Sequence, residues 1–83
     1  MLNQSFTVCL SSLELLKPNE QGIVTSFGTL NKTIIKKVMA MGIKLGSTVS
    51  LQQHYPIFIV KVGNTSIALD KGIVRAIGVR INK

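Results

Sequence analysis

The sequence predicts a mainly β domain, a small closed barrel with one inserted amphipathic helix. Short runs of β-branched and aromatic residues are separated by turn residues at the spacing of a small barrel. One segment, 32–41, has the apolar spacing of a helix instead. The length of 83 residues suits one domain with one small core, so we expect residues 1–83 to form a single unit.

The first predicted element is a short helical turn near the N-terminus. In SSLELLKPNEQG, Ser11 stands three residues before Glu14, which is the spacing of a capping box, and Pro18 stops the helix. Asn19 follows in a turn, because asparagine tolerates positive φ better than most non-glycine residues. The run IVTSF after Gly22 then predicts a strand.

The segment KTIIKKVMAM predicts an amphipathic helix of about three turns, with Asn31 as its N-cap. Its apolar side chains fill one arc of the helix, and we expect them to be buried. Met39 and Met41 lie in that arc and are expected to fill the core. Gly42 is predicted to end the helix in a left-handed conformation, with the apolar Ile43 folding back.

A second reversal is predicted at Gly46, close behind the first. Residues 48–51 then alternate as a strand, and the runs IFIVKV and TSIALD form a hairpin around Gly63-Asn64. A turn at Lys71-Gly72 leads to a last alternating strand, in which Ile77, Val79 and Ile81 point inward. Four to five short strands are therefore expected, as in a closed barrel.

Composition limits the classes of partner. The net charge of +7, from ten basic and three acidic residues, favours nucleic acid, an anionic membrane or an acidic protein surface. The apolar fraction is 46%, with 16% charged residues against roughly 25% in typical domains. Uncovered apolar surface is therefore expected, which favours a protein contact and leaves weak homo-oligomerisation open. The single cysteine, Cys9, and the lack of a signal or membrane-spanning segment favour the cytoplasm.

The sequence supplies little for catalysis or metal binding. His54 is the only histidine and Cys9 the only thiol, and nothing in the sequence orients either of them, so no enzyme is expected. A zinc site needs three or four ligands, and a ferrous site commonly needs two histidines and a carboxylate. One histidine, one cysteine and three carboxylates without a recognisable spacing do not supply either set. No nucleotide-binding glycine pattern occurs. We therefore expect neither metal nor cofactor, and direct ferrous binding through His54, Cys9 or a carboxylate is disfavoured.

Lysines gather on the outer side of the predicted helix and on its exit turn, which fits either a solvated face or an electrostatic patch. We predict a protein contact through Lys36, Lys37, Lys44, Tyr55 and Pro56, because the helix exit and the loop after the next strand are expected to be neighbours. The alternative is a small basic barrel that binds RNA. It is disfavoured, because only Tyr55 among the aromatic residues falls in a loop.

The stretches LELLKPNEQGIV, MGIKLGSTVSL, KVGNTSIALD and IGVRI, with Pro56 between them, resemble the ferrous iron transport protein A (FeoA) family over most of the chain. The most specific match is Gly42-Ile43 and Gly46, followed by an alternating strand. The resemblance implies an SH3-like β-barrel with a helix after its first strand. It also implies a small cytosolic protein that is not an enzyme.

The resemblance further implies a partner, a large membrane ferrous iron permease with a cytoplasmic GTP-binding domain. The protein would touch the inner face of the membrane only through that permease. Similar domains form the C-terminal part of some iron-dependent repressors, where they follow a DNA-binding region that this chain lacks. Lys36 and Lys37 stand where the family often has Arg, an exchange that keeps a point charge but loses bidentate contacts. Asn19 and Leu45 stand where Gly and Pro are common.

Overall fold

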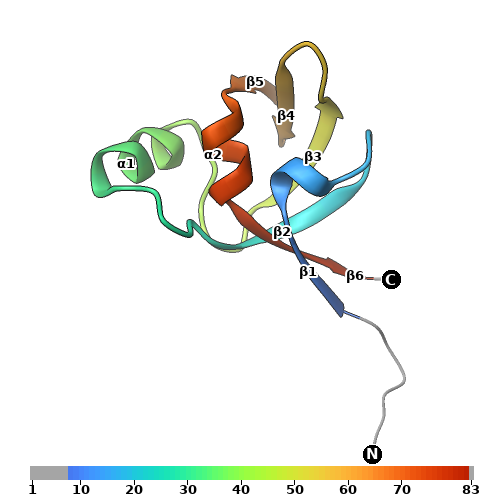
Figure 1. Cartoon of the computed structure of the whole chain (residues 1–83), viewed down its shortest axis with the longest axis horizontal. Helices are drawn as coiled ribbons and strands as arrows, with labels where there is room; N and C mark the ends of the chain where they lie inside the picture. The colour runs from blue at the N-terminus through green and yellow to red at the C-terminus, as the bar shows by residue number, and fades with distance from the viewer. Residues whose placement is uncertain (1–7, 83) are drawn as a thin grey trace, which may run out of the picture.

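The computed structural model describes residues 8–82, which form one antiparallel sheet of six strands in the order β1-β6-β2-β3-β4-β5 (Figure 1). In chain order the elements are β1 (Val8–Ser12), the 3-10 turn η1 (Leu13–Leu15), β2 (Gln21–Ser26), α1 (Lys32–Ala40), β3 (Thr48–Gln53), β4 (Phe58–Val62), β5 (Thr65–Leu69), α2 (Lys71–Ala76) and β6 (Gly78–Asn82). The mainly β class with an inserted helix is confirmed. The inserted helix follows the second strand, because β1 precedes the strand predicted at Gly22.

The sheet curls around the core but does not close, so the prediction of a closed barrel is wrong in this respect. Within residues 8–82, the edge strands β1 and β5 do not pair with each other. Two segments lie between these edges, η1 after β1 and α2 after β5. The Leu13 N–H donates to the Ile77 carbonyl oxygen at 2.9 Å, and Leu13, Val74 and Ile77 are fully buried. Apolar packing of these segments thus takes the place of the missing strand pair.

The N-terminal turn is present, but the capping box is wrong. Ser11 and Ser12 belong to the edge strand β1, where Ser11 pairs with Val79 on β6. The following turn is a single 3-10 turn, and its N-cap Ser12 makes no side-chain capping bond. Asn19 takes a φ of 71°, as the turn prediction required.

A second helix, α2, stands where a turn at Lys71-Gly72 was predicted. Asp70 caps it, because its Oδ1 accepts a hydrogen bond from the Ile73 N–H at 3.2 Å. The apolar residues Ile73, Val74 and Ile77 follow at helical spacing, which is the signal that the sequence analysis missed. The expected hairpin between β4 and β5 is confirmed, since Val62 pairs with Thr65 across two turn residues.

The core of the described region is apolar throughout. Its buried side chains are Leu13, Leu16, Val24, Val38, Ile43, Val49, Leu51, Val60, Leu69, Val74, Ile77, Val79 and Ile81. No polar side chain is buried between residues 10 and 81, so the fold is stabilised by apolar packing rather than by a buried polar network.

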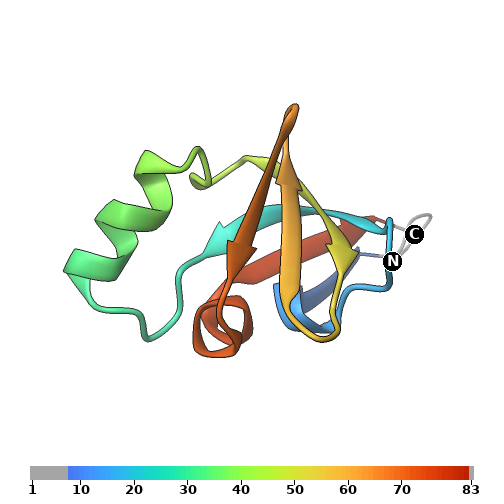
Figure 2. The same cartoon turned by 90° about the horizontal axis from the view of Figure 1, so that it is seen from above.

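Helix α1 lies beside the sheet rather than over it (Figure 2). Of its side chains only Val38 is fully buried, and the half-buried Ile34 packs against the core. Met39 and Met41 are 40% and 44% exposed, so the prediction that they fill the core is wrong. The helical arc was identified correctly, but the rest of the protein covers only part of it.

The two ends of α1 follow the prediction. The Asn31 Oδ1 accepts a hydrogen bond from the Ile34 N–H at 2.9 Å. At the other end Gly42 has a φ of 102°, its N–H donates to the Met39 carbonyl oxygen at 3.0 Å, and the Ile43 N–H donates to the Val38 carbonyl oxygen at 3.2 Å. These two bonds form a Schellman motif. The buried Ile43 then fastens the helix end to the core.

The exit turn that follows is fixed to the neighbouring strand. Gly46 has a φ of 90°, and its N–H donates to the Val24 carbonyl oxygen on β2 at 2.8 Å. The Ser47 Oγ accepts from the Lys44 N–H at 3.0 Å and donates to the Gly42 carbonyl oxygen at 3.3 Å. Leu45 stands at the corner of this turn and is 62% exposed.

Candidate functional site

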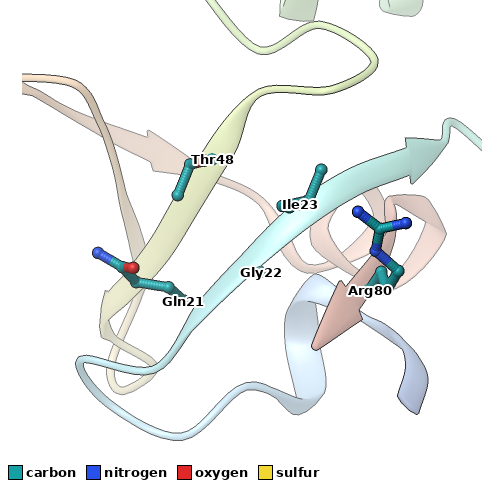
Figure 3. A pocket seen from close by; sticks show the side chains of 5 residues that line it. All are labelled: Gln21, Gly22, Ile23, Thr48 and Arg80. Atoms are coloured by element: carbon teal, nitrogen blue, oxygen red, sulfur yellow. The ribbon is translucent and has the colours of Figure 1, made fainter. Parts of the chain in front are cut away.

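One shallow hollow lies on the outer face of the sheet (Figure 3). It has a volume of about 220 Å³ and crosses β2 between Thr48 on β3 and Arg80 on β6. Gln21, Gly22 and Ile23 complete its lining. Arg80 is the single ionisable side chain that lines it, so this hollow offers no acid–base pair.

A larger groove of about 460 Å³ lies where the β3–β4 loop meets η1 and the start of α2. It is termed the groove surface, and its lining residues are Glu14, His54, Tyr55, Pro56, Ile57, Phe58, Leu69, Asp70 and Lys71. The Gln53 Nε2 donates to the Ile57 carbonyl oxygen at 3.4 Å across the base of the loop. This bond helps to hold the loop in a defined shape.

The groove surface combines apolar side chains with carboxylates. Tyr55 and Ile57 are 81% and 51% exposed. Glu14 accepts a hydrogen bond from the Arg75 Nε at 3.4 Å, and Asp70 is engaged in capping α2. Both carboxylates therefore already serve the fold, and no three His, Cys, Asp or Glu side chains gather as a metal site within the described residues. This geometry suits docking of a segment better than proton transfer.

A second exposed surface lies at the C-terminal half of α1 and its exit turn. It is termed the helix surface, and it consists of Lys36, Lys37, Met39, Met41, Lys44 and Leu45, all of which are exposed. No Asp or Glu occurs in the sequence from Gln21 to Leu69, so this stretch carries positive charge and no carboxylate of its own. The lysines thus border apolar side chains that the fold leaves in contact with solvent.

The predicted contact residues fall on both surfaces. Lys36, Lys37 and Lys44 lie on the helix surface, whereas Tyr55 and Pro56 lie on the groove surface. Strand β3 separates them, and the five steps of about 3.3 Å from Thr48 to Gln53 span about 17 Å. The expectation that the helix exit and this loop are neighbours is therefore wrong.

Some residues of the groove surface were not anticipated. Glu14, Asp70 and Lys71 reach the groove because η1 and α2 meet between the sheet edges, a contact between segments far apart in the sequence. Ile57 and Phe58 directly follow the predicted Pro56 and could have been included with it.

Within the described range, no helix has the length and apolar character needed to cross a membrane.

Solved structures share this fold. The crystal structure of an "Iron Uptake Regulatory Protein (FeoA)" superposes with a TM-score of 0.77, at 24% identity over 86% of this chain and 95% of that one. A "Manganese-dependent transcriptional repressor" superposes with a TM-score of 0.74, at 17% identity over 88% of this chain and 42% of that one. The SH3-like class implied by the sequence resemblance is thereby confirmed.

Sequence comparison identifies the family. Residues 11–81 match the FeoA domain. The "Putative Fe(2+) transport protein A" of Leptolyngbya boryana is 38% identical over 79 residues, which cover 94% of this chain and 96% of that protein. The chain therefore belongs to the FeoA family, which is associated with ferrous iron transport.

Proposed function

We propose that this protein is a non-catalytic accessory protein of ferrous iron uptake that acts by binding a membrane ferrous iron permease. The observation that carries the proposal is the match to the FeoA domain across residues 11–81. The contact would lie in the cytoplasm, on the GTP-binding region of the permease or on its cytoplasmic loops. The protein would then be peripheral to the membrane while it is bound.

The groove surface is our candidate for the permease contact. Its volume of about 460 Å³ falls within the range of roughly 300–1,000 Å³ typical of ligand sites. The exposed Tyr55 stands beside Pro56 at its rim, and exposed tyrosines are frequent anchors of protein interfaces. The half-buried Phe58 and the buried Leu69 offer an apolar base, so an extended apolar segment of the permease would fit.

RNA binding gains no support. Among residues 10–81, Tyr55 is the one exposed aromatic side chain, since Phe27 and Phe58 are half-buried. Phe6 lies outside the described residues. Single-strand binding relies on several stacking aromatics, which this surface does not offer.

The proposal is tested by substituting Tyr55→Ala in a strain that depends on this protein for ferrous iron uptake. Loss of an interface anchor costs about 2 kcal/mol, so we expect about thirtyfold weaker binding to detergent-purified permease and reduced uptake. Leu10→Ala is the matched control, because Leu10 is an exposed apolar residue on the edge strand β1 that does not line the groove. If the unaltered protein does not bind the permease, the proposed function is refuted. If the two substitutions have equal effects, the permease contact does not lie on the groove surface.

A further inference from the structure

We propose that the outer face of the sheet binds an acidic peptide segment of a partner protein through Arg80. The site is centred on the shallow hollow of Figure 3 and on a row of three side chains, Leu10 on β1, Arg80 on β6 and Ile23 on β2. This row is termed the sheet-face row. The inference goes beyond the proposed function and does not depend on it, because none of the three residues lines the groove surface.

Strand pairing places the three side chains on one face. Arg80 is the register partner of Leu10 on one side and of Ile23 on the other, and paired residues of neighbouring antiparallel strands point to the same side of a sheet. Their Cβ atoms therefore lie about 5 Å apart from one strand to the next. The face is the outer one, because Val79, which directly precedes Arg80, is fully buried in the core.

Arg80 offers a cation without a partner. The chain has two arginines, and Arg75 is paired with Glu14. Arg80 is exposed and has no ion-pair partner among the described residues. A guanidinium group binds a carboxylate through two parallel hydrogen bonds, which is why arginine is frequent at the centre of interfaces. An acidic side chain is therefore the ligand that suits Arg80.

The apolar neighbours distinguish a docking site from a solvated arginine. Leu10 is 77% exposed, and the half-buried Ile23 lines the hollow. An arginine between two aliphatic side chains has the composition of an interface hot spot, in which the surrounding contacts exclude water from the central group. A carboxylate bound to Arg80 would be shielded from solvent by both neighbours, and this shielding strengthens the ion pair.

The rest of the hollow fits the backbone of an extended peptide. Thr48 is the register partner of Ile23 on β3, and Gln21 lies two residues before Ile23 on the same face. Neither the Thr48 nor the Gln21 side chain has a hydrogen-bond partner within residues 8–82, so both can bond to peptide N–H and C=O groups. Side chains two positions apart in an extended peptide are about 6.6 Å apart, close to the strand spacing of about 4.8 Å. A segment of the form apolar-x-acidic-x-apolar therefore matches the sheet-face row.

The acidic side chain comes from another protein rather than from a second copy of this chain. The chain has three acidic residues, and each already has a partner. Glu14 pairs with Arg75, and Asp70 caps α2. The Glu20 Oε1 accepts a hydrogen bond from the Lys17 N–H at 2.9 Å.

The surrounding chemistry also separates this segment from other ligands. The groove surface suits it poorly, because Glu14 and Asp70 would repel an acidic residue there. A nucleic acid strand suits the sheet face poorly, because none of the residues that line the hollow is aromatic and no base can stack.

Titration of the isotope-labelled full chain with the acetylated and amidated peptide Ser-Leu-Ser-Glu-Ser-Leu-Ser, followed by NMR, tests the proposal. We expect saturable shifts of the amide signals of Ile23, Thr48 and Arg80. The same peptide with Gln in place of Glu should bind about tenfold more weakly, because it loses the charged hydrogen bonds. No saturable shift at these signals, or equal binding of the two peptides, would overturn the proposal.

Substitutions assign the contact to Arg80. Arg80→Gln should weaken binding of the acidic peptide about tenfold. Arg80→Lys should weaken it about threefold, because lysine keeps the charge but not the two parallel hydrogen bonds. Lys36→Gln removes one charge from an exposed position on α1 and is the control, with an expected loss of less than about twofold. Equal losses in Arg80→Gln and Lys36→Gln, or no loss in Arg80→Lys, would overturn the proposal.

Two further measurements separate this site from its alternatives. If a hexauridylate shifts the same signals at a lower concentration than the peptide does, the face binds nucleic acid and the proposal is overturned. Tyr55→Ala should leave peptide binding unchanged, because Tyr55 lies on the groove surface. A loss as large as that of Arg80→Gln would contradict the sheet-face site. Failure of the peptide to bind leaves the permease test unaffected, and failure of the permease to bind leaves the peptide test unaffected.

Discussion

The groove surface and the helix surface differ in charge, in side-chain type and in how they are attached to the core. The groove surface holds Glu14 and Asp70, two of the three carboxylates of the chain, beside an exposed tyrosine. The helix surface holds only lysines and flexible or aliphatic side chains. The groove is formed where η1 and α2 meet the sheet, whereas α1 is attached mainly through Val38 and Ile43.

This difference shows that a net charge of +7 is not a property of the whole surface. The acidic residues cluster toward the two ends of the sequence, which the fold brings together, and the middle of the chain is left cationic. A bulk charge argument would assign one acidic partner to the molecule. The arrangement of charges instead gives two surfaces of unlike charge, at opposite ends of β3.

The largest effect on the free energy of unfolding is expected from Ile43→Ala, which tests how α1 is attached to the core. Ile43 is fully buried and fastens the end of α1, so its truncation should reduce the free energy of unfolding by about 3 kcal/mol. Leu45→Ala, two residues further on, is the control and should change it by less than about 0.5 kcal/mol, because Leu45 is exposed. Urea unfolding followed by circular dichroism measures both values. Similar losses in the two variants would contradict the described anchoring of the helix.

Removal of either N-cap is expected to have a smaller effect on stability, and the effect should differ between the two helices. Asn31→Ala and Asp70→Ala each remove a capping bond to the third residue of a helix, worth about 1 kcal/mol. Because Val74 and Ile77 fix α2 within the core, Asp70→Ala should lower the melting temperature of the whole domain. Asn31→Ala should instead accelerate amide hydrogen exchange within α1 more than it lowers that temperature.

The same pattern in both N-cap variants would contradict a difference in attachment between the two helices. Hydrogen exchange resolved by residue is the deciding measurement, because it separates local opening of α1 from global unfolding. Thr29→Ala is a suitable control, since Thr29 is exposed, lies two residues before Asn31 and is not the residue whose side chain accepts the capping bond of α1.

The smallest effect is expected at the ion pair beside the groove. The Arg75 side chain is 62% exposed, and its Nε lies 3.4 Å from the Glu14 Oε1. Arg75→Gln and Glu14→Gln should each change the free energy of unfolding by less than about 0.5 kcal/mol, because exposed ion pairs are weak and screened. A double-mutant cycle measures the coupling. A coupling above about 1 kcal/mol would show that the pair is a principal brace of the groove surface.

Local signals in the sequence predicted the local features of the fold. Asn31 and Gly42 marked both ends of α1, and Gly63-Asn64 marked the hairpin, because caps and tight turns depend on a few adjacent residues. The same local reasoning failed for Ser11. Its spacing to Glu14 suits a capping box, but pairing with the distant strand β6 decided its conformation.

The extent of burial and the composition of the groove could not be predicted in this way. A helical wheel shows that Met39 and Met41 share an arc with Val38, but it does not show how wide a surface the sheet provides to cover that arc. Likewise, Glu14 and Asp70 come together only because α2 and η1 fill the gap between the sheet edges. The separation of Lys44 from Tyr55, in contrast, could have been predicted, because the sequence analysis placed a strand between them and still expected them to be neighbours.

The pairing of β1 with β6 has a practical consequence. Val8 is the register partner of Asn82, so the first and last described residues are neighbours at the same edge of the molecule. Both ends of the described chain therefore lie on the side of the molecule that faces away from α1 (Figure 1). A short peptide that joins Asn82 to Val8 would give a circular chain, and new termini opened at Gly63-Asn64 would leave the sheet order unchanged.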